Sequence, residues 1–192
     1  MSITDEDLIQ QVKSGDDTAY HILMSRYMRH IFNFILQYVR VREEAEDVTQ
    51  DTFFKAWKHI NRFKDGMRFK PWLFTIARNT ALDFIKKKKM TSFSEIDAGS
   101  AGTEDESGFA ESVVDTEPLP SELFSRAELS KQLDNAMSVL HPDHRAVLIM
   151  HYREDMTFEE IAETLKRPMN TVKSWHRRSL EKIRDSLIHI RP

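Results

Sequence analysis

A strip of 32 residues without a lysine or arginine divides this chain of 192 residues. Residues 91–122 read "TSFSEIDAGSAGTEDESGFAESVVDTEPLPSE" and contain nine acidic residues, two prolines and neither a helical nor a strand repeat. Ser, Gly, Pro and acidic residues without periodicity are typical of a flexible tether, and the strip is longer than a loop inside a compact domain usually is. We therefore predict an N-terminal domain at residues 1–90, a flexible acidic linker at residues 91–122 and a C-terminal domain at residues 123–192.

The charge of each part differs from the formal net charge of −3 for the whole chain. Residues 1–90 hold 16 Lys and Arg against 12 Asp and Glu, and residues 123–192 hold 12 against 10, so both flanking parts are mildly basic. Local charge decides what a surface attracts. The acidic average therefore does not exclude nucleic acid as a partner.

The chain contains no cysteine, so it can form neither a disulfide nor a thiolate metal site, which suits a reducing compartment. It begins with an acidic stretch instead of a signal peptide, and no 18 apolar residues follow one another. We expect a soluble cytoplasmic protein without a membrane span.

Motifs for catalysis or cofactor binding are missing from the sequence. There is no glycine-rich phosphate loop and no nucleophile motif, and the eight histidines are scattered. His141 and His144 could touch one metal ion, but they have no obvious carboxylate partner. We expect a protein that is not an enzyme, with no catalytic residue, no cofactor and no metal.

Both flanking parts show helical periodicity and no strand alternation, which predicts an all-α fold. In the N-terminal part we expect a helix capped by Thr4 and stopped at Gly15, then a helix whose apolar side chains run from Leu23 to Tyr38. A third helix is expected at roughly residues 43–60, and a fourth with Pro71 in its first turn.

The C-terminal part predicts a helix-turn-helix at about residues 158–178. Thr157 and Glu160 form a capping box before the first helix, "KRPM" makes a short turn, and Asn170 is expected to cap the second helix. The core stripe predicted for the second helix comprises Val172, His176, Leu180, Ile183 and Leu187. On or near the opposite face lie Lys173, Ser174, Arg177, Arg178 and Glu181.

The second helix of such a motif enters the major groove of DNA, where Arg and Lys can bond guanine edges. The capped helix and the tight turn before it favour this interpretation over a merely solvated basic face. His176 is expected to be half-buried with one nitrogen satisfied, because an imidazole on a core stripe needs a partner.

The third helix combines a core stripe with a polar surface that Phe54 interrupts. Asp47 and Asp51 lie near its N-terminal end, where the helix dipole favours anions, so they could act as stabilising residues only. The same face, with Gln50, could equally dock a basic partner helix. The spacing alone leaves both interpretations open.

The stretch "FKPWLFTIARNTALDFIKKKK" at residues 69–89 is rich in aromatic residues and ends in four lysines. Aromatic rings stack on unpaired bases for about 1 to 3 kcal/mol per base, and lysines neutralise phosphates. Trp72 and Asn79 with this basic end therefore suit single-stranded DNA. The alternative is that Phe69 and Trp72 cap the core while the lysines complement the C-terminus of the helix.

Three segments in this order resemble one known family. "AEDVTQDTFFKAWKHINRF", then "FKPWLFTIARNTALDFIKKKK", then "LHPDHRAVLIMHYREDMTFEEIAETLKRPMNTVKSWHRRSLEKIR" are similar to the extracytoplasmic-function (ECF) group of bacterial RNA polymerase sigma factors. The resemblance covers nearly the whole chain. It implies an alternative sigma factor with two small helical domains, the C-terminal one a helix-turn-helix, that promotes promoter melting and transcription initiation.

The resemblance also implies roles for individual residues. Asp47, Gln50, Asp51 and Phe54 match the segment that docks on the coiled coil of the β′ subunit of core RNA polymerase. Phe63, Lys64, Phe69, Trp72 and Asn79 match the region that captures an unstacked base of the non-template strand at the minus-ten element. Lys173, Ser174, Arg177 and Arg178 match the readers of the minus-thirty-five duplex.

Family members are commonly held inactive by an anti-sigma factor, which is therefore an expected partner. The chain departs from the family at His176, where an aliphatic residue is common, and at Leu180, where arginine is common. Two rival hypotheses stay open: a conventional helix-turn-helix regulator that binds duplex DNA without polymerase, and an anti-sigma-like scaffold that does not need Arg177 and Arg178.

Overall fold

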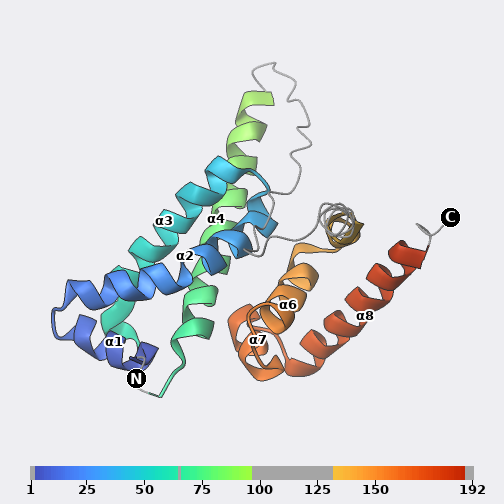
Figure 1. Cartoon of the computed structure of the whole chain (residues 1–192). Helices are drawn as coiled ribbons and strands as arrows, with labels where there is room; N and C mark the ends of the chain where they lie inside the picture. The colour runs from blue at the N-terminus through green and yellow to red at the C-terminus, as the bar shows by residue number, and fades with distance from the viewer. Residues whose placement is uncertain (1–2, 65, 97–131, 189–192) are drawn as a thin grey trace, which may run out of the picture.

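The computed structural model describes residues 3–64, 66–96 and 132–188, and every regular element in these ranges is a helix (Figure 1). This confirms the predicted all-α class. The linker prediction lies outside the described residues from 97 onward, and the last helix of the N-terminal part continues to Ile96, beyond the predicted start of the linker. Within the described ranges, no helix combines the length and apolar character needed to cross a bilayer.

The N-terminal part consists of α1 (Asp5–Lys13), α2 (Asp17–Val39), α3 (Arg42–His59), the 3₁₀ turn η1 (Ile60–Arg62) and α4 (Phe69–Ile96). The predicted capping box of α1 is present, because the Asp7 amide donates to Thr4 Oγ1 at 3.2 Å and the Asp7 side chain accepts from the Thr4 amide. Gly15 follows with φ +99°, a left-handed conformation that glycine adopts without strain. The chain can therefore turn directly into α2.

The core of the N-terminal part lies where α2 meets α3 and α4. The stripe predicted for α3 is buried throughout: Ala45, Val48, Thr52, Ala56 and Ile60. Phe34 of α2 packs edge to face on Phe74 of α4 with ring centroids 5.0 Å apart. The hydroxyl of Tyr20 donates across the bundle to the Phe53 carbonyl. These contacts hold both α3 and α4 against α2.

The C-terminal part comprises helical residues 132–138, α6 (Pro142–Tyr152), α7 (Phe158–Leu165) and α8 (Met169–Ile188). The predicted capping box of α7 is confirmed, with the Thr157 amide donating to Glu160 Oε2 at 2.8 Å. Lys166 ends α7 in a left-handed conformation. Helix, tight turn and longer helix are thus arranged as a helix-turn-helix.

Two details of α8 differ from the prediction. Asn170 is not the cap, because α8 begins at Met169 and the Pro168 carbonyl accepts from the amides of Thr171 and Val172. Leu180 is 40% exposed, whereas Ser179 is fully buried. At this turn the core face of α8 therefore runs through Ser179 instead of Leu180, whereas Val172 is buried as predicted.

The spacing of Leu129, Leu133, Met137 and Leu140 predicts an apolar stripe on the helix before α6, and the structure differs there as well. Leu133 is exposed, and the small Ala136 is buried in its place together with Leu140. The apolar stripe predicted for this segment also included Leu129, which lies outside the described residues.

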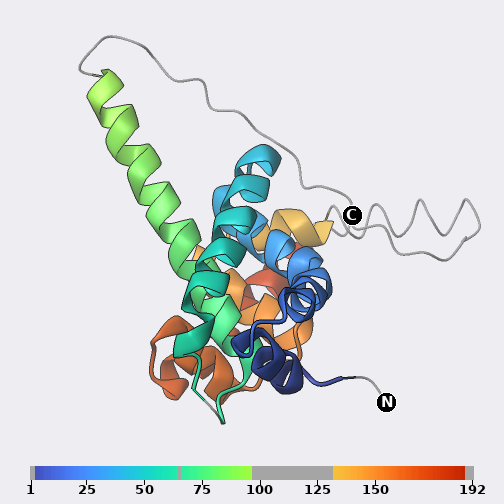
Figure 2. The same ribbon diagram turned by 90° about the vertical axis from the view of Figure 1, so that its left-hand side faces the viewer.

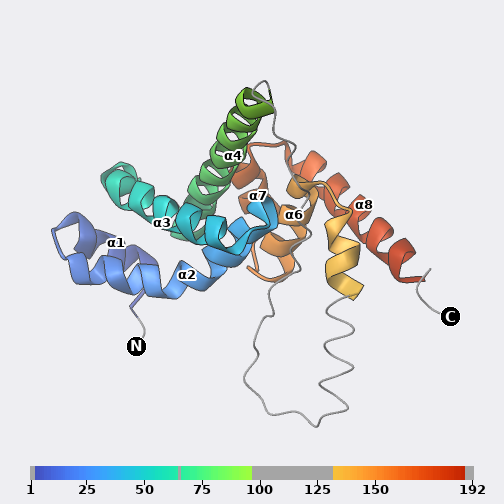
Figure 3. The same ribbon diagram turned by 90° about the horizontal axis from the view of Figure 1, so that it is seen from above.

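The N-terminal and C-terminal parts pack directly on each other. Figures 1 and 3 show α1 and α3 on one side of α4 and α6, α7 and α8 on the other, while α2 crosses α4 toward α6. In Figure 2, viewed from the left of Figure 1, the C-terminal part lies largely behind the N-terminal part. Contacts join α4 to α7 and α2 to α6. The Thr164 hydroxyl of α7 donates to the Pro71 carbonyl of α4 at 3.3 Å. This seam places α4 at the centre of the molecule.

Candidate nucleic-acid and partner interfaces

The basic face predicted for α8 is open to solvent. Lys173, Arg177 and Arg178 are exposed and Ser174 is half-buried. Arg177 approaches Glu181 only at 3.8 Å, with both side chains largely in water, so this pair scarcely neutralises the guanidinium. The four residues therefore form one accessible donor surface on the second helix of the helix-turn-helix.

Contacts with α6 and α7 hold α8 in place behind this surface. Val172 is completely buried, and the Ser179 hydroxyl donates back to the Trp175 carbonyl at 2.7 Å. Trp175 lies under a cation, because the Arg167 guanidinium carbon is 5.8 Å from the centroid of its indole ring. The packing side of α8 is thus separate from the side that carries the donors.

His176 belongs to an aromatic cluster between these two sides. Its Nε2 lies 3.0 Å from the Tyr152 hydroxyl, and its ring stacks on Tyr152 at 5.5 Å. His151 and Phe158 meet it edge to face, each at 5.2 Å. The prediction of a half-buried histidine with one satisfied nitrogen is confirmed. Burial, and then the neighbouring His151, lower the pKa of His176, so the neutral ring is favoured.

The aromatic rings around the predicted base-capturing loop are mostly inside the protein. Phe63 and Phe69 are buried, and their rings pack edge to face at 6.2 Å. Trp72 is half-buried and lies 5.4 Å from Phe63 and 5.7 Å from Phe69. The burial of Phe69 agrees with the alternative in which Phe69 and Trp72 cap the core, and Phe63 packs into the same apolar floor beneath the connection from η1 to α4.

The polar members of the same set are accessible. Lys64 and Asn79 are exposed, and Trp72 keeps part of its indole at the surface. The Phe63 carbonyl accepts a hydrogen bond from Lys13 Nζ at 2.8 Å, which ties the connection to α1. The connection from η1 to α4 thus packs on buried aromatic rings, and Lys64 and Asn79 lie exposed to solvent beside it.

The predicted docking face on α3 is also accessible. Asp47, Gln50, Asp51 and Phe54 are all exposed. Phe54 is 59% exposed, and Trp57, 48% exposed, lies beside it with ring centroids 6.4 Å apart. The sequence prediction missed Trp57, although its spacing of three residues from Phe54 places both on one helix face. Two exposed aromatic rings next to carboxylates are unusual for a solvated surface.

No metal site is present among the described residues. Within residues 3–64, 66–96 and 132–188, no three His, Asp or Glu side chains converge in a way that could hold an ion. His141 instead caps α6, because its Nδ1 accepts from the Asp143 amide at 3.2 Å. The pair His141 and His144 thus has a structural explanation.

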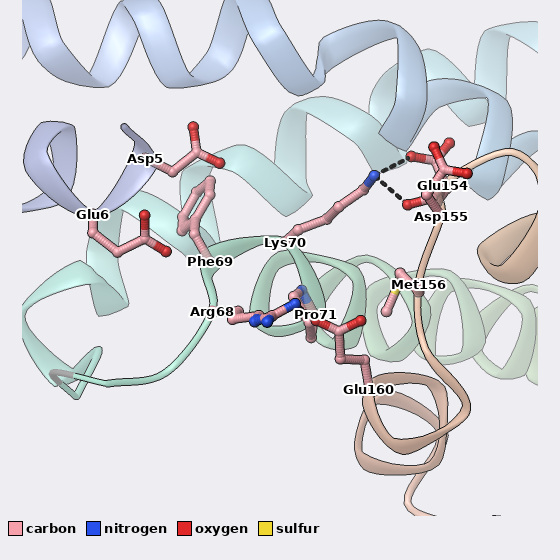
Figure 4. Close-up of a pocket in the computed structure, with 10 residues that line it drawn as sticks. All are labelled: Asp5, Glu6, Arg68, Phe69, Lys70, Pro71, Glu154, Asp155, Met156 and Glu160. Carbon is pink, nitrogen blue, oxygen red and sulfur yellow. Dashed lines mark hydrogen bonds and ion pairs between the residues drawn. The ribbon is translucent and has the colours of Figure 1, made fainter. Parts of the chain in front are cut away.

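A cavity of about 390 Å³ lies at the seam between the two parts (Figure 4). Its lining contains acidic and basic side chains from both parts, and Lys70 reaches across it to Glu154. The lining residues are Asp5, Glu6, Arg68, Phe69, Lys70, Pro71, Glu154, Asp155, Met156 and Glu160.

Comparisons with known proteins agree with this arrangement. The family model "Sigma-70 region 2" matches residues 23–91, and "Sigma-70, region 4" matches residues 130–183. ECF RNA polymerase sigma factor SigW of Bacillus subtilis is 32% identical, over 93% of this chain and 94% of the relative. The ECF RNA polymerase sigma-E factor of Escherichia coli is 28% identical, over 90% of this chain and 88% of the relative.

Solved structures show the same fold. CnrH, solved in complex with the cytosolic domain of CnrY, matches with a TM-score of 0.68 and 21% identity, over 97% of this chain and 99% of that chain. RpoE of Bartonella quintana, solved with the anti-sigma factor NepR, matches with a TM-score of 0.67 and 22% identity, over 90% and 98%. The order of the two matched regions and the near full-length similarity to SigW show that the chain belongs to the ECF family of RNA polymerase sigma factors, which are not enzymes.

Proposed function

We propose that this alternative sigma factor binds core RNA polymerase through α3, reads the minus-thirty-five element through α8 and stabilises the melted minus-ten element through α4 and the loop before it. The proposal rests on one observation: α3, α4 with the loop before it, and α8 each carry an exposed surface, and the three surfaces differ in chemistry. One surface is acidic and aromatic, one is basic on a helix-turn-helix, and one is polar beside an aromatic floor.

The minus-thirty-five contacts are assigned to Lys173, Ser174, Arg177 and Arg178. Their exposure on the second helix of the motif supports this assignment, because such a helix places its early turns in the major groove. Arginine can donate two hydrogen bonds to one guanine, and lysine and serine can bond phosphates or bases. His176 supports them from behind without adding charge.

The minus-ten contacts are assigned to Lys64, Trp72 and Asn79 at the surface, with Phe63 and Phe69 beneath them. Lys64 would contact a phosphate, and the amide of Asn79 would bond a base edge. The exposed part of Trp72 offers a stacking edge for an unpaired base. Phe63 and Phe69 act by shaping the floor on which such a base would rest.

The polymerase-docking face is assigned to Asp47, Gln50, Asp51 and Phe54, joined by Trp57. An exposed aromatic pair supplies the apolar anchor of an interface, and the surrounding carboxylates select a basic partner surface. The coiled coil of the polymerase β′ subunit is the proposed partner. Asp51 pairs with Lys55 at 2.8 Å, which keeps the carboxylate oriented at the surface.

Control by an anti-sigma factor is part of the same proposal. RpoE of Bartonella quintana was solved with the anti-sigma factor NepR, and we extend that kind of partner to this chain. We further propose that the protein acts in the cytoplasm, where it would meet polymerase and promoter DNA. The order of the two regions supports a domain boundary between residues 91 and 122.

Reconstituted run-off transcription tests the function. Purified core polymerase with this protein should initiate on a subset of promoters in a cognate genomic library, and core polymerase alone should not. A folded protein that supports no initiation on any fragment would contradict the proposal. Tight sequence-specific binding of duplex DNA without polymerase would instead favour a conventional regulator.

A further inference from the structure

We propose that the C-terminal domain masks the cations of the minus-ten surface in the free protein, with three of its acidic side chains occupying the positions of DNA phosphates. The masked cations are Arg68, Lys70 and Arg78, and the masking acids are Glu160, Glu154 and Asp143. The inference rests on the minus-ten surface of the proposed function.

Each of the three cations lies next to a residue assigned to the minus-ten surface. Arg68 and Lys70 flank Phe69, and Arg78 directly precedes Asn79 on α4. Cations at such positions are what the phosphates of an unpaired strand require. Each of them instead meets a carboxylate from across the seam.

The best formed of these pairs is Arg78 with Asp143. Arg78 Nη2 donates to both carboxylate oxygens, at 2.9 Å and 3.2 Å, and Arg78 Nε donates to Asp143 Oδ1 at 3.2 Å. Their side chains are only 11% and 12% exposed. A fork of this kind is also how arginine binds a phosphate, so Asp143 and a DNA phosphate would compete for the same donors.

Glu154 forms the second point of contact. Its side chain is 1% exposed and lies 3.2 Å from Lys70 Nζ and 3.0 Å from His30 Nδ1. Lys70 also donates to the Glu154 carbonyl, and Figure 4 shows the amine extended between the two acceptors. Arg68 completes the set through Glu160 at 2.8 Å, although Arg68 itself is largely exposed.

This closed arrangement is also too short for a promoter. The minus-ten and minus-thirty-five elements are about 25 base pairs apart, which is roughly 80 Å of B-form DNA. A compact folded chain of this length measures only about 40 Å across. The two DNA-binding surfaces can therefore reach both elements only after the seam opens, and opening separates all three ion pairs.

Opening and unmasking can be measured together. The chain has no cysteine, so Gln11→Cys in α1 and Lys182→Cys in α8 allow two spin labels at exposed positions of the two domains. The wild-type sequence in this labelled background should give a short distance, up to about 40 Å. The triple variant Asp143→Asn, Glu154→Gln, Glu160→Gln keeps the side-chain shapes, and glutamine can retain the α7 capping box. It should give a broad distribution at longer distances.

The same triple variant should bind fluorescent single-stranded oligo(dT) about tenfold more tightly without polymerase, with a steeper dependence on salt, because three cations become available. The converse variant Arg68→Ala, Lys70→Ala, Arg78→Ala should also open but gain no affinity. Glu159→Gln, an exposed acid of α7 outside the seam, is the matched control and should change neither readout.

Each outcome decides the inference. If the triple acidic variant is folded by circular dichroism yet keeps the short distance, or opens without binding oligo(dT) more tightly, the masking hypothesis is wrong. Added core polymerase should lengthen the wild-type distance beyond about 60 Å on a promoter fragment. Failure of polymerase to bind at all would contradict the proposed function, while the distances and oligo(dT) affinities of the free variants would still decide the masking.

Discussion

Phe54 and Trp57 lie side by side on the outer face of α3, with their ring centroids 6.4 Å apart and about half of each side chain in water. Within the part of the chain that the structure describes, no other element covers them, although the same helix buries its opposite stripe. An apolar pair kept at the surface next to Asp47 and Asp51 is best explained by a partner that covers it.

Replacing either ring by alanine should weaken binding to core polymerase by about 2 kcal/mol, roughly thirtyfold, because aromatic anchors dominate interface energies. Fluorescence anisotropy of the labelled protein titrated with core enzyme measures this. Met28→Ala, which removes another exposed apolar side chain on α2, is the matched control and should bind as the wild type does. Equal affinity for Phe54→Ala, Trp57→Ala and Met28→Ala would exclude α3 as the docking face.

In the polymerase complex, Arg177→Ala and Arg178→Ala should each weaken the binding free energy for the minus-thirty-five element by about 1 to 3 kcal/mol, because each removes base or phosphate contacts. Footprinting on promoter fragments with wild-type and scrambled upstream elements separates the two kinds of contact. Arg184→Ala, later on the same helix and also exposed, should have little effect. The scaffold hypothesis predicts no loss from any of the three.

Phe69→Ala should lower the free energy of unfolding by about 3 to 5 kcal/mol, because the ring is 2% exposed and packs on Tyr27, Phe63 and Trp72. Asn79→Ala should change stability by less than about 0.5 kcal/mol but reduce promoter opening. Urea denaturation and permanganate reactivity of promoter thymines measure the two effects. A stable Phe69→Ala variant would mean that the aromatic floor is not part of the core.

Acidification should destabilise the C-terminal domain. Burial lowers the pKa of His176 below its unfolded value, and burial with the nearby His141 does the same for His144, so the unfolded chain binds more protons. Stability is therefore fully present above about pH 6.5 and is lost as the pH falls through the lowered pKa values.

His176→Gln should reduce this pH dependence, which thermal melts between pH 5 and pH 8 can show. His21→Gln removes an exposed imidazole of α2 outside the cluster and should keep the wild-type slope. If His176→Gln also kept that slope, the imidazole cluster would not be the cause.

Local patterns predicted the helices and their caps because these depend on neighbours three or four residues apart. Thr4 with Asp7 and Thr157 with Glu160 form their boxes as expected. The prediction that Leu180 lies in the core was wrong, because it used hydrophobicity alone. The position next to it, Ser179, is buried instead, and its small side chain suits close helix packing.

The seam between the domains could not be predicted from the sequence. Arg78 and Asp143 are 65 positions apart, and Arg68 and Glu160 are 92 positions apart. A solvated charge and a paired charge look alike in a local pattern, since only the packing of the C-terminal part on the N-terminal part brings these partners together. The sequence left open for the same reason whether Phe69 caps the core, and the structure buries it.

The attachment of α8 through Val172 and Ser179 leaves Arg177 and Arg178 exposed and outside the core. Evolution or an engineer can therefore exchange Arg177 and Arg178 for other polar residues and keep the domain intact. Orthogonal transcription circuits in one cell could be built on this scaffold by rewriting that one helical face.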